Sequence, residues 1–372
     1  MTDSLTGPAD AGDGAAAQEA VERERAEMRE FVDGLTVDDL DSGAWFAKLC
    51  ARALRTYTEK ATWEYFQGKY LGMPADGIVD RRIKLAARYA MIEGGLSSAA
   101  YTAAVAATIG SRGGASRAMI PAGAAAFVVD MAVLSQLQIR LAYDIAVIYR
   151  IPLNVDDPED LWKLVRVAFA IKTGEVARTG ATKFVPGVVR QVVKKYYSGA
   201  VRESAMALPY VGQHLLQRNV IKFGIPAIGI PVTVVVNRWT TKAAGRYARS
   251  VFRNEARVIE VVETLIRRTR HPKLILWVAW LVINADGTIT DDETLLFQLL
   301  TRLVREQHQV TDEHLARVID INPGQVWRRV AAETGDLSDV IDAAEQVAAI
   351  DGDINAAEKA VIAELRDRCS RS

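Results

Sequence analysis

Apolar side chains recur at helical spacing along most of this chain. Within residues 17–68 large apolar residues such as Trp45 and Leu49 stand three or four positions apart, the spacing of one helix face. The segment Leu71–Pro74 ends this pattern, because Gly and Pro both interrupt helices. The only β-branched run, Thr233–Val236, lies between helical patterns, so we predict an all-α fold.

Two apolar runs bear on membrane insertion. The run Ala122–Val133 is interrupted by Asp130, and the 14-residue run Phe223–Val236 contains Pro226 and Pro231. A membrane-spanning helix needs roughly 20 apolar residues, whereas shorter runs are typical of a buried core or an interfacial segment. We therefore expect no membrane span, but an apolar helical hairpin that packs in a core or dips into a membrane face.

Three charged residues interrupt the long helix expected from Ala122 to Arg150. Asp130, Arg140 and Asp144 lie among apolar neighbours, and buried charges need partners. Such residues often serve function, but Arg140 and Asp144 are also spaced i,i+4, as an ion pair within one helix requires. We favour the interpretation that they form an internal ion pair that fixes helix packing.

The net charge of zero conceals an uneven distribution. Residues 161–270 hold 20 Lys and Arg against 5 Asp and Glu, whereas residues 1–160 hold 16 against 23 and residues 271–372 hold 10 against 18. A basic middle between acidic flanks favours an anionic partner. It also allows a second interpretation, in which the acidic C-terminal part docks on the basic middle.

The basic residues nearest to aromatic side chains are candidates for binding an anionic surface. Trp239 stands between Arg238 and Lys242, and such neighbours suit a bilayer interface, where each basic residue contributes about 1 kcal/mol. No nucleic-acid-binding motif is visible, so we favour an anionic membrane surface or a membrane protein over nucleic acid. The candidates are a lysine pair and a helical stripe of arginines: Lys194, Lys195, Arg246, Arg249, Arg253 and Arg257.

The composition fits a cytoplasmic protein. The only two cysteines, Cys50 and Cys369, are far apart, so a disulfide framework is not expected. The N-terminus lacks the apolar core of a secretory signal, and residues 1–20 are expected to form a disordered acidic tail. No HExxH, GxSxG, Walker A or GxGxxG pattern occurs, so the motifs favour a protein that is not an enzyme.

One short motif occurs twice near the C-terminus, each time after an apolar helical run. Asp286-Gly287 and Asp351-Gly352 are each followed by Ile two residues after the Gly and by Glu seven residues after the Asp, at Glu293 and Glu358. This spacing resembles the second half of a calcium-binding loop. Val282 and Val347 stand where each loop would need its leading acid, so neither loop is expected to bind calcium alone. We therefore consider Asp286, Glu293, Asp351 and Glu358, converging from both copies, as ligands of calcium or another hard divalent cation.

A structural interpretation of the same residues competes with the metal site. Thr290-x-x-Glu293 and Asn355-x-x-Glu358 have the spacing of capping boxes, in which the Glu satisfies free amides at a helix start, worth about 1 kcal/mol. Gly would then provide the positive φ of each turn. The two roles are compatible, because a capping Glu has a second carboxylate oxygen.

The chain resembles two families. The paired Asp-Gly motifs of residues 272–370 are similar to the TerB-like module, and this resemblance implies a small all-helical domain with metal-binding acidic corners. The segments Ala122–Leu153 and Ala207–Arg253 are similar to the EcsC family, over about residues 60–260. This second resemblance implies a cytoplasmic or membrane-peripheral protein and carries no reaction.

Together these features predict a tail over residues 1–20, an apolar and basic EcsC-like helical domain over 21–270, and a TerB-like helical domain over 271–372. The leading hypothesis is a non-enzymatic adaptor at the inner face of the cell membrane, whose terminal module binds a divalent cation or a protein partner, as in envelope or metal stress. The alternative is a metal-dependent hydrolase acting on a lipid or envelope precursor. A third hypothesis is an interaction protein whose acidic domain covers its own basic face.

Overall fold

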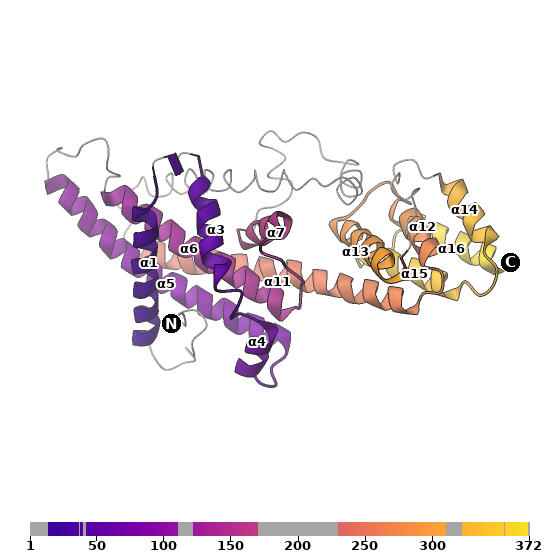
Figure 1. Ribbon diagram of the computed structural model, residues 1–372, viewed down its shortest axis with the longest axis horizontal. Coiled ribbons are helices and arrows are strands. Elements are labelled where there is room, and N and C mark those ends of the chain that lie inside the picture. The colour runs from indigo at the N-terminus through magenta and orange to yellow at the C-terminus, as the bar shows by residue number, and fades with distance from the viewer. Residues whose placement is uncertain are drawn as a thin grey trace. The chain divides into compact units, whose positions relative to one another are not determined.

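A computed structural model describes residues 14–36, 38–39, 42–110, 122–169, 230–309, 322–352 and 354–370. Every regular element in these ranges is an α-helix, which confirms the predicted all-α fold (Figure 1). Thr233–Val236, the only strand-like run in the sequence, lies inside a helix. The chain divides into two compact units, one containing 1–175 and 201–252, the other containing 176–200 and 253–372.

The N-terminal unit is organised around two long helices that pack against each other, α5 (Ala75–Gly110) and α6 (Ala122–Ile148). Helix α1 (Gly14–Asp33) packs against both of them, and its buried positions, from Ala17 to Val32, recur at helical spacing. The remaining helices of this unit cover the pair: α3 (Ala44–Arg55), α4 (Trp63–Lys69), α7 (Pro158–Ala168) and the first part of α11 (Ile230–Arg268).

Helix α11 approaches the pair closely at Gly245. A Cβ atom at this position would lie 2.8 Å from Ile83 Cγ1 and 3.1 Å from Leu141 Cδ2, which is closer than packed atoms allow. A larger residue here would require Ile83 or Leu141 to move, so Gly favours this separation between the helices. The face of α11 that packs inward includes Asn237, Thr241 and Phe252, all buried.

The C-terminal unit surrounds one apolar helix, α12 (Pro272–Ile283), in which every residue from Leu274 to Ile283 is buried. Among the described residues, helix α12 packs against four further helices of this unit. These are α13 (Asp291–His308), α14 (Pro323–Ala332), α15 (Ser338–Ala348) and α16 (Ala356–Ser370). The last part of α11 joins the same core through Val258, Val262 and Leu265.

Two boundaries differ from those expected from the sequence. Residues 14–20 belong to α1 and not to a tail, because Ala has a high helix propensity and Ala17 is buried. The two units divide at Phe252 and Arg253, inside α11, and not near residue 271. The sequence signal at that point, Pro272, marks the start of α12 within the second unit.

One described segment, Val128–Ile148, is long and apolar enough to cross a membrane. However, 78% of its apolar window is buried within the protein. The side chains of Val128–Val133 are all buried, including Asp130. The apolar character of this part of α6 is therefore accounted for by helix packing.

Candidate functional site

The two Asp-Gly motifs form two similar turns in the C-terminal unit. Gly287 and Gly352 adopt positive φ angles of 74° and 93°, which confirms the role predicted for the glycines. Asp286 Oδ1 accepts a hydrogen bond from the amide of Thr288 at 2.8 Å, as is typical of an aspartate that stabilises its own turn. Asp286 and Asp351 are both exposed.

Both motif glutamates cap the helix that follows. Glu293 Oε2 accepts hydrogen bonds from the amide of Thr290 at 2.7 Å and from its hydroxyl at 2.8 Å, and Thr290 Oγ1 accepts one from the amide of Glu293. Glu358 Oε2 accepts a hydrogen bond from the amide of Asn355 at 2.8 Å, and Asn355 Oδ1 accepts one from the amide of Glu358 at 3.0 Å. The capping prediction is confirmed in both copies.

The structure brings the two copies of the motif together. Asn355 Nδ2, from the second copy, donates a hydrogen bond to Asp286 Oδ2, in the first, at 3.0 Å. Burial raises the pKa of Glu293 and of Glu358, and the charges of Asp286 and Asp351 raise both pKa values further. The four carboxylates therefore lie close enough to repel one another.

This gathering of carboxylates is where the sequence predicts a metal site. Among the described residues, no group of three or more His, Cys, Asp or Glu is arranged to hold a metal ion. Both Asp286 oxygens already accept hydrogen bonds, and one oxygen of each glutamate is used in capping. The metal-site prediction for Asp286, Glu293, Asp351 and Glu358 thus finds no support in this geometry.

The predicted arginine stripe on α11 is divided among different partners. Arg249 pairs with Asp80 at 2.7 Å, and Arg257 donates a hydrogen bond to the Ile350 carbonyl at 2.5 Å. Arg246 and Arg253 are exposed. Lys194 and Lys195 lie outside the described residues. The four described arginines therefore differ in their surroundings, with Arg249 and Arg257 held by partners within the protein.

The first part of α11 combines exposed apolar and basic side chains. Only four large hydrophobic side chains are exposed in the part of the chain that the structure describes, and three of them lie within five residues of α11: Val235, Val236 and Trp239, with Trp239 exposed to 69%. Arg238, Lys242 and Arg246 follow at intervals of four, and Arg238 and Arg246 are exposed. We call the residues Val235, Val236, Arg238, Trp239, Lys242 and Arg246 the α11 surface.

The charged residues of α6 each find a partner on another helix. Asp144 accepts hydrogen bonds from the Tyr57 hydroxyl at 2.7 Å and from Arg82 Nε at 2.9 Å. Burial opposes the charge of Arg82, but the Asp144 carboxylate outweighs it and raises the pKa of the arginine above its ordinary value. The pair is an internal ion pair between α5 and α6.

Arg140 likewise pairs with an acidic residue of another helix. Its Nη1 lies 2.8 Å from Glu24 Oε1, and its Nε donates a hydrogen bond to the Ala53 carbonyl at 3.0 Å. Arg140 and Asp144 thus pair with other helices and not with each other, although they are spaced i,i+4. Asp130 pairs with Arg25 of α1 at 3.0 Å.

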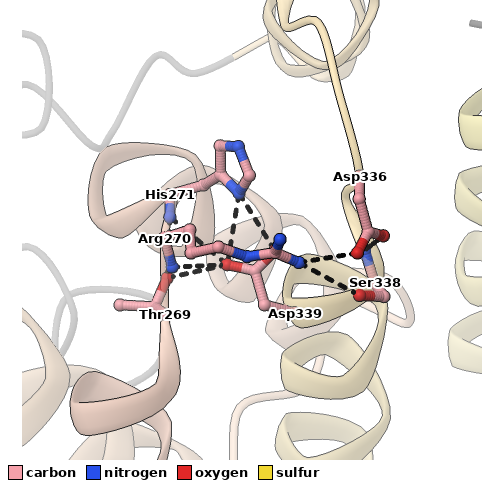
Figure 2. A network of polar contacts seen from close by, with 6 residues as sticks. All are labelled: Thr269, Arg270, His271, Asp336, Ser338 and Asp339. Carbon is pink, nitrogen blue, oxygen red and sulfur yellow. Dashed lines mark hydrogen bonds and ion pairs between the residues drawn. The ribbon is translucent and has the colours of Figure 1, made fainter.

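A polar network that the sequence analysis did not identify fixes the start of α12. Figure 2 shows Asp339, at the start of α15, facing the backbone of Arg270 and the ring of His271. Asp339 Oδ2 accepts a hydrogen bond from the Arg270 amide at 2.7 Å, and Asp339 Oδ1 lies 3.0 Å from His271 Nδ1. Arg270 also pairs with Asp336 at 2.8 Å.

This network joins two segments almost 70 residues apart in the sequence. Burial alone would raise the pKa of Asp339, but the Arg270 amide and the His271 ring outweigh it and hold the pKa below its ordinary value. The arrangement supplies backbone hydrogen bonds where α11 ends and α12 begins. It stabilises the packing of the C-terminal unit.

Comparisons with protein families, with curated proteins and with solved structures found no match. The candidate sites therefore rest on the geometry of this chain alone.

Proposed function

We propose that this protein is a non-enzymatic, membrane-peripheral adaptor that contacts an anionic lipid surface through the α11 surface. The observation that carries the proposal is the exposure of Val235, Val236 and Trp239 beside Arg238 and Arg246. Soluble proteins rarely leave several large apolar side chains together in water without a partner.

The chemistry of the α11 surface fits a bilayer interface. Trp is favoured at headgroup depth, where its ring meets the acyl chains and its N–H remains hydrated. Arg238, Lys242 and Arg246 lie along the same helix face, where each adds about 1 kcal/mol of attraction to anionic lipid. The inner leaflet of a cell membrane provides both the negative charge and the apolar depth.

The described contacts favour this function over the two alternatives. Asp130 and Asp144, which a metal-dependent hydrolase would use as ligands, are already paired with arginines. Arg257 donates a hydrogen bond to the Ile350 carbonyl, as expected if the acidic domain covers the basic face of the chain. Trp239 and Arg246, however, remain exposed. The EcsC-like and TerB-like resemblances stay part of the proposal, and the first of them agrees with a peripheral location.

Co-sedimentation of the full chain with lipid vesicles tests the proposal. We expect binding to vesicles that contain phosphatidylglycerol, little binding to pure phosphatidylcholine, and release at high salt, which screens exposed charges. Trp239→Ala removes the largest inserted side chain and should weaken binding by roughly tenfold or more. Arg246→Glu reverses one basic charge and should weaken it by about tenfold.

Two matched variants separate the α11 surface from general charge or apolarity. Arg267 is exposed on the same helix but belongs to the C-terminal unit, and Leu71 is exposed to 86% in the turn before α5. Arg267→Glu and Leu71→Ala should bind as the wild type does. If the wild-type chain ignores phosphatidylglycerol vesicles at low salt, or if Arg267→Glu weakens binding as much as Arg246→Glu, the proposal is wrong.

A further inference from the structure

Buried acids outnumber buried bases where α1, α5 and α6 pack together. Arg140 pairs with Glu24, and Arg82 pairs with Asp144. The third arginine, Arg25, faces two carboxyl groups. Burying an ion without a counter-ion is costly, so such a group tends to take up a proton instead. Among the described residues, the buried acids here are Glu24, Glu93, Asp130 and Asp144, and the bases are the buried Arg25 and Arg82 and the half-buried Arg140.

A single nitrogen atom of Arg25 contacts the carboxyl groups of both Glu93 and Asp130. Arg25 Nη1 lies 2.7 Å from Glu93 Oε1 and 3.0 Å from Asp130 Oδ1, so the two acids, from α5 and α6, lie beside each other. The Glu93 side chain is only 1% exposed, and its second oxygen, Oε2, is buried without a hydrogen-bond donor. A carboxylate oxygen in this position lacks the partner that buried polar atoms ordinarily have.

A proton shared by the two acids would remove the excess negative charge and provide a hydrogen-bond donor between the two carboxyl groups. Carboxylates cannot donate hydrogen bonds, but a protonated acid can donate one to its neighbour. Burial raises the pKa of Glu93 to about 8, and nearby Asp130 raises it while Arg25 lowers it. Two close carboxyl groups that share one site commonly ionise in two separate steps in this way.

We propose that Glu93 and Asp130 hold one proton between them, and that its release loosens α1 from α5 and α6. On release, the O–H bond of the acid breaks and the proton passes to water. A second buried negative charge then faces the single guanidinium of Arg25. The remaining way to solvate that charge is to admit water, and α1 supplies one side of the site.

The surroundings of the pair agree with this mechanism. A cavity of about 20 Å³, room for roughly one water molecule, adjoins Glu93 and is lined by Ala20, Val21 and Glu24 of α1. Other charged and titratable groups face it from each helix. These are Glu24 and Arg25 from α1, Tyr89 with neighbouring Arg82 and Arg88 from α5, and Asp130 from α6. On α11, Arg238 contacts Met91 of α5 and is exposed.

Hydrogen exchange at the amides of α1 in the full chain tests the proposal. If the open form of α1 leaves Glu93 with its ordinary pKa, opening should become up to about tenfold more frequent per pH unit between about pH 5.5 and 7.5, after correction for intrinsic exchange. Glu93→Gln mimics the protonated acid, so its α1 amides should stay protected across this range. Asp130→Asn should behave similarly, because either change removes the need for the shared proton.

Glu24→Gln provides the matched control. It leaves Arg140 without its carboxylate and should raise exchange at every pH while keeping the wild-type pH dependence. The proposal is overturned if Glu93→Gln keeps the wild-type pH dependence, or if it resembles Glu24→Gln. Infrared difference spectra of the wild-type chain give an independent check, which does not depend on the variants folding: a protonated carboxylic acid band must be present at neutral pH and disappear above about pH 9.

Discussion

The N-terminal unit places several buried charged side chains between its helices, whereas the C-terminal unit carries two of its three buried glutamates, among the described residues, at helix starts around an apolar core helix. Arg82 and Asp144 lie between α5 and α6, and both are buried. In α12, by contrast, all ten residues from Leu274 to Ile283 are buried and uncharged. Its neighbours carry their buried glutamates, Glu293 and Glu358, at the first turn.

This difference shows what each unit depends on. An apolar core gains stability from area removed from water, and it tolerates changes of similar volume. A buried ion pair adds little net stability, but it penalises any arrangement that separates the partners. We therefore expect the helix register of the N-terminal unit to be set by its ion pairs, and that of the C-terminal unit by its caps and its apolar packing.

The largest effect should come from breaking a buried pair. Asp144→Ala leaves the Arg82 guanidinium buried without its carboxylate and should lower the free energy of unfolding by about 3–5 kcal/mol. Urea denaturation followed by circular dichroism measures this loss. Replacing both partners with apolar residues, as in Arg82→Met with Asp144→Leu, should cost much less, because no charge remains unpaired.

An exposed pair of the C-terminal unit is the control for that comparison. Glu364 and Arg368 are 2.6 Å apart, but both side chains are more than 40% exposed. Glu364→Ala should change stability by less than about 1 kcal/mol. Equal losses from Asp144→Ala and Glu364→Ala would remove the distinction between the two units.

An intermediate effect is expected at the start of α12. Asp339→Asn weakens the hydrogen bonds to Arg270 and His271 and should cost about 1–2 kcal/mol near neutral pH. The pKa of Asp339 is lowered on folding, so this contribution is complete above the ordinary Asp pKa and is lost as the pH falls through the folded value. Wild type and variant should therefore converge in acid, as thermal melts at several pH values would show. A constant difference would mean that the carboxylate charge is not what stabilises the junction.

The smallest effect should come from the capping glutamates. Glu293→Ala removes the acceptor of the Thr290 amide and should cost about 1 kcal/mol. Glu293→Gln should cost less, because it keeps an acceptor and removes repulsion from Asp286 and Asp351. The pKa of Glu293 is raised on folding, so the advantage of Gln should grow as the pH rises above about 4.5.

Adding calcium tests whether the motif glutamates serve only as helix caps or also bind a metal ion. If the glutamates serve only as caps, calcium should leave the melting temperature of the wild type unchanged. A calcium-dependent rise that Glu293→Gln abolishes would show that a cation binds at the Asp-Gly corners, contrary to the geometry described above.

Features with local causes were predictable from the sequence. The helical periodicity predicted the all-α fold, Thr290-x-x-Glu293 predicted a capping box, and the Asp-Gly pairs predicted positive φ angles. Each of these depends on residues within one or two helical turns. The interruption of an apolar helix by Asp130 and Asp144 likewise indicated buried charges.

Features that depend on distant residues were not predictable. The partners of the α6 charges lie 62 to 116 positions away, so only the folded chain shows that Asp144 meets Arg82 and that Arg140 meets Glu24. The i,i+4 spacing of Arg140 and Asp144 suggested the wrong partner for each. Asp339 and His271 carried no motif at all, and the first turns of α1 were assigned to a tail because residues 14–20 contain no large apolar side chain.

The most direct test of the proposed function follows residue 239 itself. A spin label attached to Trp239→Cys, in a chain whose Cys50 and Cys369 are replaced by Ser, reports whether this position enters a bilayer. We predict that phosphatidylglycerol vesicles increase the exposure of the label to oxygen, which concentrates in lipid, and decrease its exposure to a water-soluble relaxation agent. A label at Arg267→Cys should show neither change. Unchanged accessibility at position 239, with the vesicles present and salt low, would contradict the membrane contact on which the proposed function rests.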